Sequence, residues 1–376
     1  MINNKKKVLF ITDYYLPHWT GLSKSLNLIV AALDKKNNCS VLTIAHQKNL
    51  DKQEIIDDHS VYRVGFWWTI SRAKFAPAIL LKYLQLLDKH DYVVINSPFT
   101  FILPLTILAK LFTKRVYIFH QGDLILPVGF FNKIIEGIFN ISSLMAFVLA
   151  DGLATYTKDY AQHSRLLKYF RGKTSNFIIP FPMTKKTNKK LKKIIDLRRK
   201  YSTIIGLSGR FVEEKGFDNL FKAIPLINQK NSDLHFVFAG EKNMGYEDFF
   251  HQHQQLYKQV KQQISFLGLL AGEELESFYH SLDALVMPSR SDCFGLVQAE
   301  AMRYEKPVIV TNIIGGRDVV KQTKFGEIAE ANNVTDLAEK ILLFAKQKES
   351  YQRFLPAVKN YFSFKKNLAD LEHWLA

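Results

Sequence analysis

Short apolar runs alternate with amphipathic segments along the whole chain, and this alternation predicts strands and helices in turn. In the first half the predicted strands lie near 8–12, 40–44, 92–95, 116–120, 152–156 and 176–179, and the predicted helices near 23–34 and 131–150. A parallel sheet covered by helices on both faces has this pattern. We therefore expect a first Rossmann-like, doubly wound α/β domain.

The same alternation begins again after residue 202. Its predicted strands lie near 203–208, 234–240, 264–267, 284–287 and 308–311, with helices near 217–229, 249–263 and 273–281, one from about 295, and terminal helices. Two doubly wound sheets in tandem predict a two-lobed α/β protein, whose ligands bind beyond the carboxyl ends of the strands. The cleft between the lobes is the expected active site.

The border between the two domains is expected where prolines and lysines gather. Pro180 and Pro182 stop regular structure, and residues 184–200 carry nine Lys or Arg. The predicted parts are a first domain over 1–182, a basic linker over 183–202, a second domain over 203–355, and a helical segment over 356–376 that crosses back to the first domain.

Composition narrows the setting of the protein. The 376 residues contain only two cysteines, Cys39 and Cys293, which argues against a disulfide scaffold and suits a reducing compartment. Three lysines precede an apolar run of four residues, which is a first strand rather than a signal peptide. No stretch reaches the roughly 18 apolar residues of a transmembrane helix, and the nearest, 99–111, is too short. A cytoplasmic location is expected.

The net charge of +16 is concentrated in the first half of the chain. Residues 1–200 hold 31 Lys or Arg against 13 Asp or Glu, whereas residues 201–376 hold 20 against 22. A general solubility bias is one explanation, but it would not leave the second half neutral. We therefore favour a functional role for the positive charge, which would attract an anionic membrane surface, an anionic acceptor or nucleic acid. The apolar segments 65–70 and 128–131 would then lie near lipid, or else belong to the core.

The segment 287–302 carries the most informative chemistry. A strand ends at Met287, a polar loop follows, and a helix begins around Gly295, Leu296 and Val297. The unpaired N–H groups and positive dipole end of a helix N-terminus suit a diphosphate.

Two acidic side chains, Asp292 and Glu300, follow that strand eight positions apart, and both can accept hydrogen bonds from ligand hydroxyls. The alternative is that Asp292 caps the helix and that Glu300 lies on a solvated face.

Asp292 to Glu300 resembles the acidic–x7–acidic signature of GT-B glycosyltransferases, particularly the retaining family 4 (glycosyl transferases group 1). The usual form is Glu-x-Phe-Gly-x-x-x-x-Glu-Ala, of which this chain keeps Phe294, Gly295, Glu300 and Ala301. Asp292 stands where the first Glu is usual. The resemblance implies that Asp292 contacts donor sugar hydroxyls and that Glu300 contacts the ribose.

A second match follows the first strand of the second domain. The run 208–216 resembles the family's Gly-Arg-x4-Lys-Gly element, although a lone Gly-Arg or Lys-Gly is common on surfaces. Gly209 permits a tight backbone, and the cations of Arg210 and Lys215 can neutralise a leaving diphosphate. The resemblance also places Gly240 and Phe266 at strand ends near the nucleotide base.

The first half matches the family more loosely. The loop 17–21 resembles its Pro-x-x-Gly-Gly loop near the donor phosphates, with Thr20 in place of one glycine and Gly21 retained. His120 resembles the histidine that contacts the donor sugar, although a satisfied core histidine at a strand end is the alternative. Near Asp123 an Asp-x-Asp metal motif lacks its second Asp, so no metal is expected.

The resemblance implies a retaining glycosyltransferase that uses a UDP- or GDP-sugar, needs no cofactor, and has His120, Arg210, Lys215 and Asp292 as its catalytic residues. Since no convincing nucleophile is found in the first half, a same-face mechanism is favoured over double displacement. A saccharide or lipid-linked acceptor is expected, in cell-surface polysaccharide or lipopolysaccharide assembly, peripherally on the inner face of the plasma membrane. The rivals are a nucleotide-sugar epimerase of the same architecture and a basic nucleic-acid-binding protein, for which we find no binding module.

Overall fold

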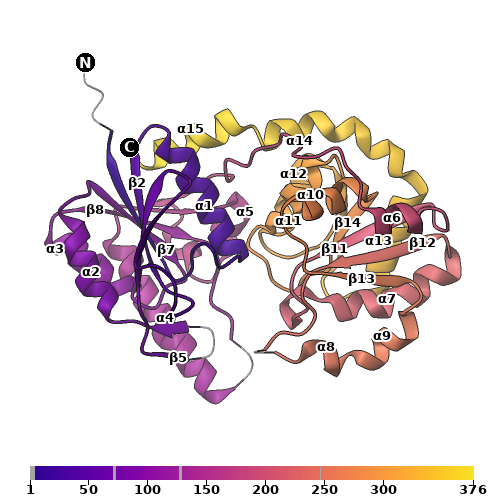
Figure 1. Cartoon of the computed structure of the whole chain (residues 1–376), viewed down its shortest axis with the longest axis horizontal. Helices are drawn as coiled ribbons and strands as arrows, with labels where there is room; N and C mark the ends of the chain where they lie inside the picture. The colour runs from indigo at the N-terminus through magenta and orange to yellow at the C-terminus, as the bar shows by residue number, and fades with distance from the viewer. Residues whose placement is uncertain (1–4, 71–72, 127–128, 246) are drawn as a thin grey trace. The chain divides into compact units, whose positions relative to one another are not determined.

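The computed structural model describes residues 5–70, 73–126, 129–245 and 247–376. The chain forms two compact units, coloured along the chain in Figure 1. The first unit comprises Met1–Pro180 together with Phe364–Ala376, and the second comprises Phe181–Ser363.

The first unit contains an eight-stranded sheet in the order β10-β9-β8-β7-β1-β2-β4-β3, parallel throughout except for the β3–β4 pair. Its strands are β1 Lys7–Thr12, β2 Asn38–Ile44, β3 Gln53–Ile56, β4 His59–Val64, β7 Tyr92–Ser97, β8 Arg115–His120, β9 Gly152–Thr155 and β10 Thr174–Asn176. A separate hairpin pairs β5 Trp68–Ile70 with β6 Ala73–Phe75. Its helices are α1 Gly21–Asp34, α2 Ala78–Leu87, α3 Ile102–Leu111, α4 Phe130–Leu149, α5 Lys158–His163, the 3₁₀ turn η1 Leu167–Phe170 and α15 Phe364–Trp374.

Apolar side chains cover both faces of this sheet. Every residue of β7 is buried, as expected for a central parallel strand between two helical layers. The C-terminal helix α15 completes the core, because the Trp374 ring lies 5.4 Å from the rings of Tyr117 and Phe177. The last 13 residues therefore belong physically to the first unit.

The second unit contains a fully parallel six-stranded sheet in the order β13-β12-β11-β14-β15-β16. Its strands are β11 Thr203–Ser208, β12 Leu234–Ala239, β13 Ile264–Gly268, β14 Ala284–Met287, β15 Val308–Thr311 and β16 Gly326–Ala329. Its helices are α6 Lys192–Leu197, η2 Glu213–Lys215, α7 Phe217–Lys230, α8 Phe249–Gln252, α9 Gln254–Val260, α10 Gly272–Ser281, α11 Leu296–Arg303, α12 Asp318–Thr323, α13 Val334–Gln347, η3 Lys348–Phe354 and α14 Leu355–Tyr361.

Some elements differ from those expected. The strand expected near 176–179 lies at β10 Thr174–Asn176, and the helix expected over 249–263 is divided into α8 and α9. The short elements β3–β6, α2, α3, α12 and β16 were not predicted. Their segments are too short for a clear hydrophobic period, so packing against the sheets decides their conformation.

Residues 183–202, expected as a linker, are packed within the second unit. The Leu191 N–H donates to Ser281 Oγ at 2.7 Å, Arg198 pairs with Asp283 at 3.0 Å, and Ile194 is buried. The two units therefore carry 24 Lys or Arg against 14 Asp or Glu and 27 against 21, respectively. The charge asymmetry between the units is much weaker than that between the two halves of the sequence.

Helix α4 differs from the expectation that no segment is apolar enough to span a membrane. Within the described residues, α4 is long and apolar enough, by length and composition alone, to cross a membrane, and 17% of its apolar window is buried. The expectation that no such stretch exists counted uninterrupted apolar residues, and polar residues interrupt α4 at several positions up to Ser143.

Candidate active site

The two motifs of the second unit meet at one edge of its sheet. The neighbouring strands β11 and β14 lie at the point where the strand order reverses. Ligands of doubly wound sheets bind at the carboxyl ends of the strands at this switch point. The run 208–216 follows β11 and the run 288–300 follows β14, so both motifs lie at that point.

Arg290 fixes these two loops to each other. Its N–H donates to the Glu214 carbonyl at 2.8 Å, and its guanidinium donates to the Glu213 carbonyl at 2.8 Å. The same guanidinium binds both carboxylate oxygens of Asp218, at 2.7 and 2.8 Å. Burial alone would raise the Asp218 pKa, but Arg290 and Lys222 hold it below its usual value. Arg290 was not singled out from the sequence, although it stands inside the motif.

Lys215 and Asp292 form an ion pair across the two loops. Lys215 Nζ lies 2.7 Å from Asp292 Oδ2, and the side chains are 23% and 12% exposed. Burial opposes the charge of Lys215, but the carboxylates of Asp292 and Glu214 raise its pKa above the usual value. Lys215 is therefore held in its charged form beside the Asp292 carboxylate. Arg210, which is more exposed, reaches Glu214 at 3.3 Å.

Two glycines allow the backbones at this edge to touch. A Cβ on Gly240 would lie 1.8 Å from the Gly209 carbonyl oxygen, and one on Gly216 would lie 2.1 Å from the Pro288 carbonyl oxygen. Both positions also have positive φ, 152° and 64°. Close backbone packing at the strand ends thus requires Gly240, while the space beside Gly209 is open.

The helix α11 begins at the same edge. Gly295 is its N-cap with φ of 73°, and no side chain caps the helix. The Gln298 amide donates to the carbonyls of Phe294 and Gly316, at 2.7 and 2.8 Å, and so fixes the preceding loop. Leu296 and Val297 are partly exposed in the first turn, where their N–H groups have no partner within the helix. The arrangement can bind an anion.

Glu300 is held by a tyrosine from another helix. The Tyr279 hydroxyl donates to Glu300 Oε2 at 2.5 Å and lies 3.0 Å from Ser208 Oγ at the end of β11. Burial and the Glu300 charge raise the Tyr279 pKa well above its usual value, so the phenol stays a donor. Glu300 is thus a buried carboxylate at the switch point and not a member of a solvated face. Only tertiary packing brings Tyr279 to this carboxylate.

Phe294 and Phe266 lie in aromatic clusters. The buried Phe294 ring is 6.5 Å from Phe362, which makes it part of the core. Phe266 is partly exposed, and its ring lies 5.0 Å from Phe238 and 4.9 Å below Lys242 Nζ. A partly exposed ring at a strand end is suited to contact with a planar base.

In the first unit, His120 is fully buried at the end of β8. Its Nδ1 lies 3.0 Å from Ser97 Oγ and its Nε2 lies 3.1 Å from Asp123 Oδ1. Asp123 also accepts from Ser164 Oγ and the Arg165 N–H, both at 2.8 Å. Burial would raise the Asp123 pKa, but His120 and these donors lower it to about 2. Both ring nitrogens of His120 therefore have protein partners, as in a satisfied core histidine.

Further polar side chains at this edge were not predicted. Asn96 and Gln121 are buried and hydrogen-bonded to each other, and Asn96 also donates to Thr12 Oγ1 at 3.2 Å. Asp13 follows β1, and within the described residues its buried Oδ1 has no hydrogen-bond partner. Burial raises the Asp13 pKa well above its usual value.

Gly21 begins α1 directly after the loop that follows β1. Thr20, which replaces a family glycine, is the N-cap: its Oγ1 accepts from the Ser23 N–H at 3.1 Å, and its own N–H donates to Ser23 Oγ at 2.8 Å. This reciprocal cap explains a threonine at that position. Open space surrounds Gly21.

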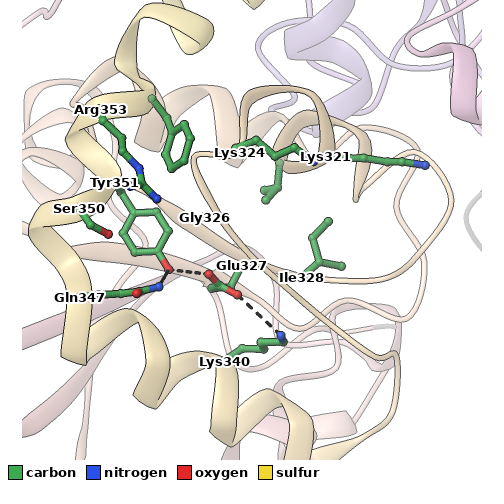
Figure 2. A pocket seen from close by; sticks show the side chains of 12 residues that line it. Lys321, Lys324, Gly326, Glu327, Ile328, Lys340, Gln347, Ser350, Tyr351 and Arg353 are labelled. Atoms are coloured by element: carbon green, nitrogen blue, oxygen red, sulfur yellow. Dashed lines mark hydrogen bonds and ion pairs between the residues drawn. The ribbon is translucent and has the colours of Figure 1, made fainter.

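No metal cluster is visible in the described parts of the chain, where no group of three or more His, Cys, Asp or Glu side chains is placed to hold an ion. A cavity of about 390 Å³ lies elsewhere in the second unit and contains none of the predicted site residues (Figure 2). Its polar wall is internally paired, because Glu327 accepts from Tyr351 at 2.6 Å and pairs with Lys340 at 3.8 Å.

Part of the chain is similar in sequence to known glycosyltransferases. Residues 188–361 match the model of the family described as Glycosyl transferases group 1. An uncharacterized glycosyltransferase of Methanocaldococcus jannaschii is 38% identical over 136 residues, 36% of each chain. The capsular polysaccharide biosynthesis glycosyltransferase CapM of Staphylococcus aureus is 30% identical over 146 residues, 37% of this chain and 35% of that one. The matched segments span about a third of these relatives.

Solved structures match over nearly the whole chain. HepE of Anabaena, solved with UDP and glucose, has a TM-score of 0.76 at 16% identity, covering 98% of this chain and 99% of that one. The sucrose-phosphate synthase of Thermosynechococcus elongatus has a TM-score of 0.74 at 14% identity, covering 98% of each. These likenesses confirm the expected GT-B fold.

Proposed function

Because residues 188–361 match the model of the glycosyl transferases group 1 family, we propose that the chain is a glycosyltransferase acting on a nucleoside diphosphate sugar. The observation that carries the proposal is the Lys215–Asp292 pair, placed at the switch point beside the N-terminus of α11. The pair combines a fixed cation for a diphosphate with a carboxylate for sugar hydroxyls. HepE, which shares the fold, is solved with UDP and with UDP-glucose. A UDP- or GDP-sugar is the proposed donor.

In the proposed complex the diphosphate lies against the α11 N-terminus, near Lys215 and Arg210. Negative charge grows on the diphosphate as the glycosidic bond breaks, so these cations stabilise the transition state more than the bound donor. Asp292 uses two acceptor positions for Lys215 and the Phe294 N–H, out of about four on a carboxylate. The others suit donor sugar hydroxyls. Glu300, fixed by Tyr279, is the proposed ribose contact.

We propose transfer with retention through a same-face mechanism. Double displacement needs a carboxylate about 5 Å from its acid partner. The Asp123 carboxylate is already engaged by His120 and by the Ser164 hydroxyl. The departing diphosphate then takes the acceptor's proton. His120 is proposed as a donor sugar contact, although its ring nitrogens are engaged, and Gly21 as a backbone approach to the phosphates.

The proposed acceptor is a saccharide or lipid-linked saccharide in cell-surface polysaccharide or lipopolysaccharide assembly. The name of CapM, a relative in capsular polysaccharide biosynthesis, supports this setting. We further propose a cytoplasmic enzyme that attaches peripherally to the inner face of the plasma membrane.

A donor screen tests the proposal. The purified chain is incubated with UDP- and GDP-sugars, with and without membrane lipid extract, and products are identified by mass spectrometry and their anomeric configuration by NMR. We expect a retained glycoside only when acceptor is present. An epimer formed from donor alone would make the protein an epimerase, and absence of any donor turnover would reject the proposal.

A further inference from the structure

Helix α4 in the first unit presents its apolar side chains to solvent. The exposed members are Phe130, Phe131, Ile134, Ile135, Ile138, Ile141, Met145, Val148 and Leu149. At 3.6 residues per turn these nine side chains fall within a stripe about 140° wide. Phe131, Ile138 and Ile141 are 78%, 66% and 62% exposed. Residues 130 and 131 are thus not core, and Val128 lies outside the described residues.

The side of α4 that faces the protein mixes polar and apolar side chains. Ser143 is buried there together with Ala146 and Phe147, and Glu136 on the same side accepts from the Leu126 N–H. A surface helix of a globular protein normally shows the opposite distribution, with apolar side chains inward. An exposed apolar stripe of this size marks an interaction surface.

Helix α3, which packs against α4, carries further exposed apolar side chains. Leu111 and Phe112, at its end, are 73% and 42% exposed. The surface is thus wider than one helix, which suits a planar partner better than a groove for a single peptide.

The part of the chain that carries this surface has an excess of positive charge. Residues 101–173 contain nine Lys or Arg and four carboxylates. Asp123, Asp151 and Glu136 are engaged by His120, Lys110 and the Leu126 N–H, respectively, and Asp159 is buried. The basic side chains include the exposed Lys133 on α4 itself. A surface that is apolar and has an excess of cations complements an anionic lipid surface.

The connections of α4 determine how it would meet lipid. It joins β8 to β9, which pair in parallel in the sheet. Its last carbonyls, those of Phe147 and Val148, accept from Lys173 Nζ at 2.9 and 2.8 Å. The C-terminal end of α4 is therefore held next to the start of β10, so we expect the helix to offer one face to lipid rather than to span a bilayer.

We propose that the exposed face of α4, continued by Leu111 and Phe112, inserts in the plane of an anionic lipid membrane and docks the first unit there. The role of this docking, which is to bring the enzyme to a lipid-linked acceptor, rests on the proposed function. The physical attachment needs no sugar, so the two are tested separately.

The test uses the full chain and vesicles of phosphatidylcholine with or without an equal part of phosphatidylglycerol. The double variant Ile138→Gln with Ile141→Gln removes apolar area from the face. The matched control, Ile55→Gln with Leu269→Gln, alters residues that are 75% and 78% exposed elsewhere. Circular dichroism melting shows whether each variant is folded, and a milder variant, Ile138→Ala, replaces any that is not.

We expect wild type and control to sediment with the phosphatidylglycerol vesicles. The α4 variant should bind at least about tenfold more weakly, because two apolar side chains that would be buried in lipid are replaced by polar ones. Lys133→Gln should weaken binding about fivefold on anionic vesicles only. Equal binding by the α4 variant, or no vesicle binding by wild type, would overturn the proposal. A wild-type dimer that becomes monomeric in the α4 variant, without lipid binding, would assign the face to a second copy and also overturn it.

Donor binding by calorimetry separates the two proposals. The α4 variant should bind UDP-sugar as wild type does. Lipid binding by a protein that turns over no sugar donor would leave the docking proposal standing and reject the proposed function.

Discussion

At the scale of single residues, Lys215 holds a positive charge where the proposed diphosphate departs. Lys215→Ala should lower kcat by about 10²–10³-fold with a smaller change in donor KM, because the charge on the leaving group grows in the transition state. Steady-state kinetics measure both constants. Lys321→Ala, which alters a cavity lysine outside the site, serves as the control. Normal turnover by Lys215→Ala would place the diphosphate elsewhere.

Tyr279 is a positioning residue for Glu300. Tyr279→Phe removes the hydrogen bond to Glu300 and should raise the donor KM by about tenfold, equivalent to about 1.4 kcal/mol, with kcat nearly kept. Tyr351→Phe is the matched control, because the Tyr351 hydroxyl binds Glu327 at 2.6 Å in the cavity that lies away from the proposed site. Equal KM values in the two variants would remove the ribose role of Glu300.

Asp123 makes stability depend on pH. Its pKa of about 2 in the folded state lies below the unfolded value of about 3.9. Its contribution, about 2 kcal/mol, is therefore complete above about pH 4 and is lost as pH falls toward 2. Urea unfolding of wild type and Asp123→Asn should show the difference in unfolding free energy shrinking over this window. A difference independent of pH would contradict the ionised pairing.

At the scale of elements, α15 links the end of the chain to the first unit. Trp374→Ala should destabilise that unit by about 3–5 kcal/mol, because the ring fills space beside Tyr117 and Phe177. Denaturant unfolding followed by circular dichroism measures the loss. Trp19→Ala, at a tryptophan that is 65% exposed, should change stability little. Similar losses in both variants would argue against core packing of α15.

At the scale of the whole molecule, the cations of the proposed site are side chains. Transfer should therefore proceed undiminished in EDTA, since Arg210 and Lys215 supply the positive charge. Product formation with EDTA, compared with added Mg²⁺ or Mn²⁺, checks this expectation. Strict dependence on either ion would contradict it and direct attention to Asp123.

The sequence by itself determined the fold class and the longer elements. Strands such as β1 and β11 are apolar runs of about six residues. Their local pattern and their burial in a parallel sheet both favour an extended conformation, so the sequence alone predicts them. The motif with Asp292 and Glu300 and the motif with Arg210 and Lys215 each follow an apolar run, so the sequence also placed both motifs directly after strands. The resemblance supplied their expected chemistry.

Tertiary structure decided which side chains meet. Tyr279 reaches Glu300, Arg290 binds Asp218, and residues 183–202 pack on the second unit through contacts between residues far apart in sequence. From the sequence, the apolar segments 65–70 and 128–131 were equally consistent with the core and with the surface. The packing of α4 through Ser143, Ala146 and Phe147 fixes which side of the helix faces the protein, and so leaves its apolar stripe exposed. Hydrophobic periodicity gives the face of a helix, but the packing of its neighbours determines whether that face is covered.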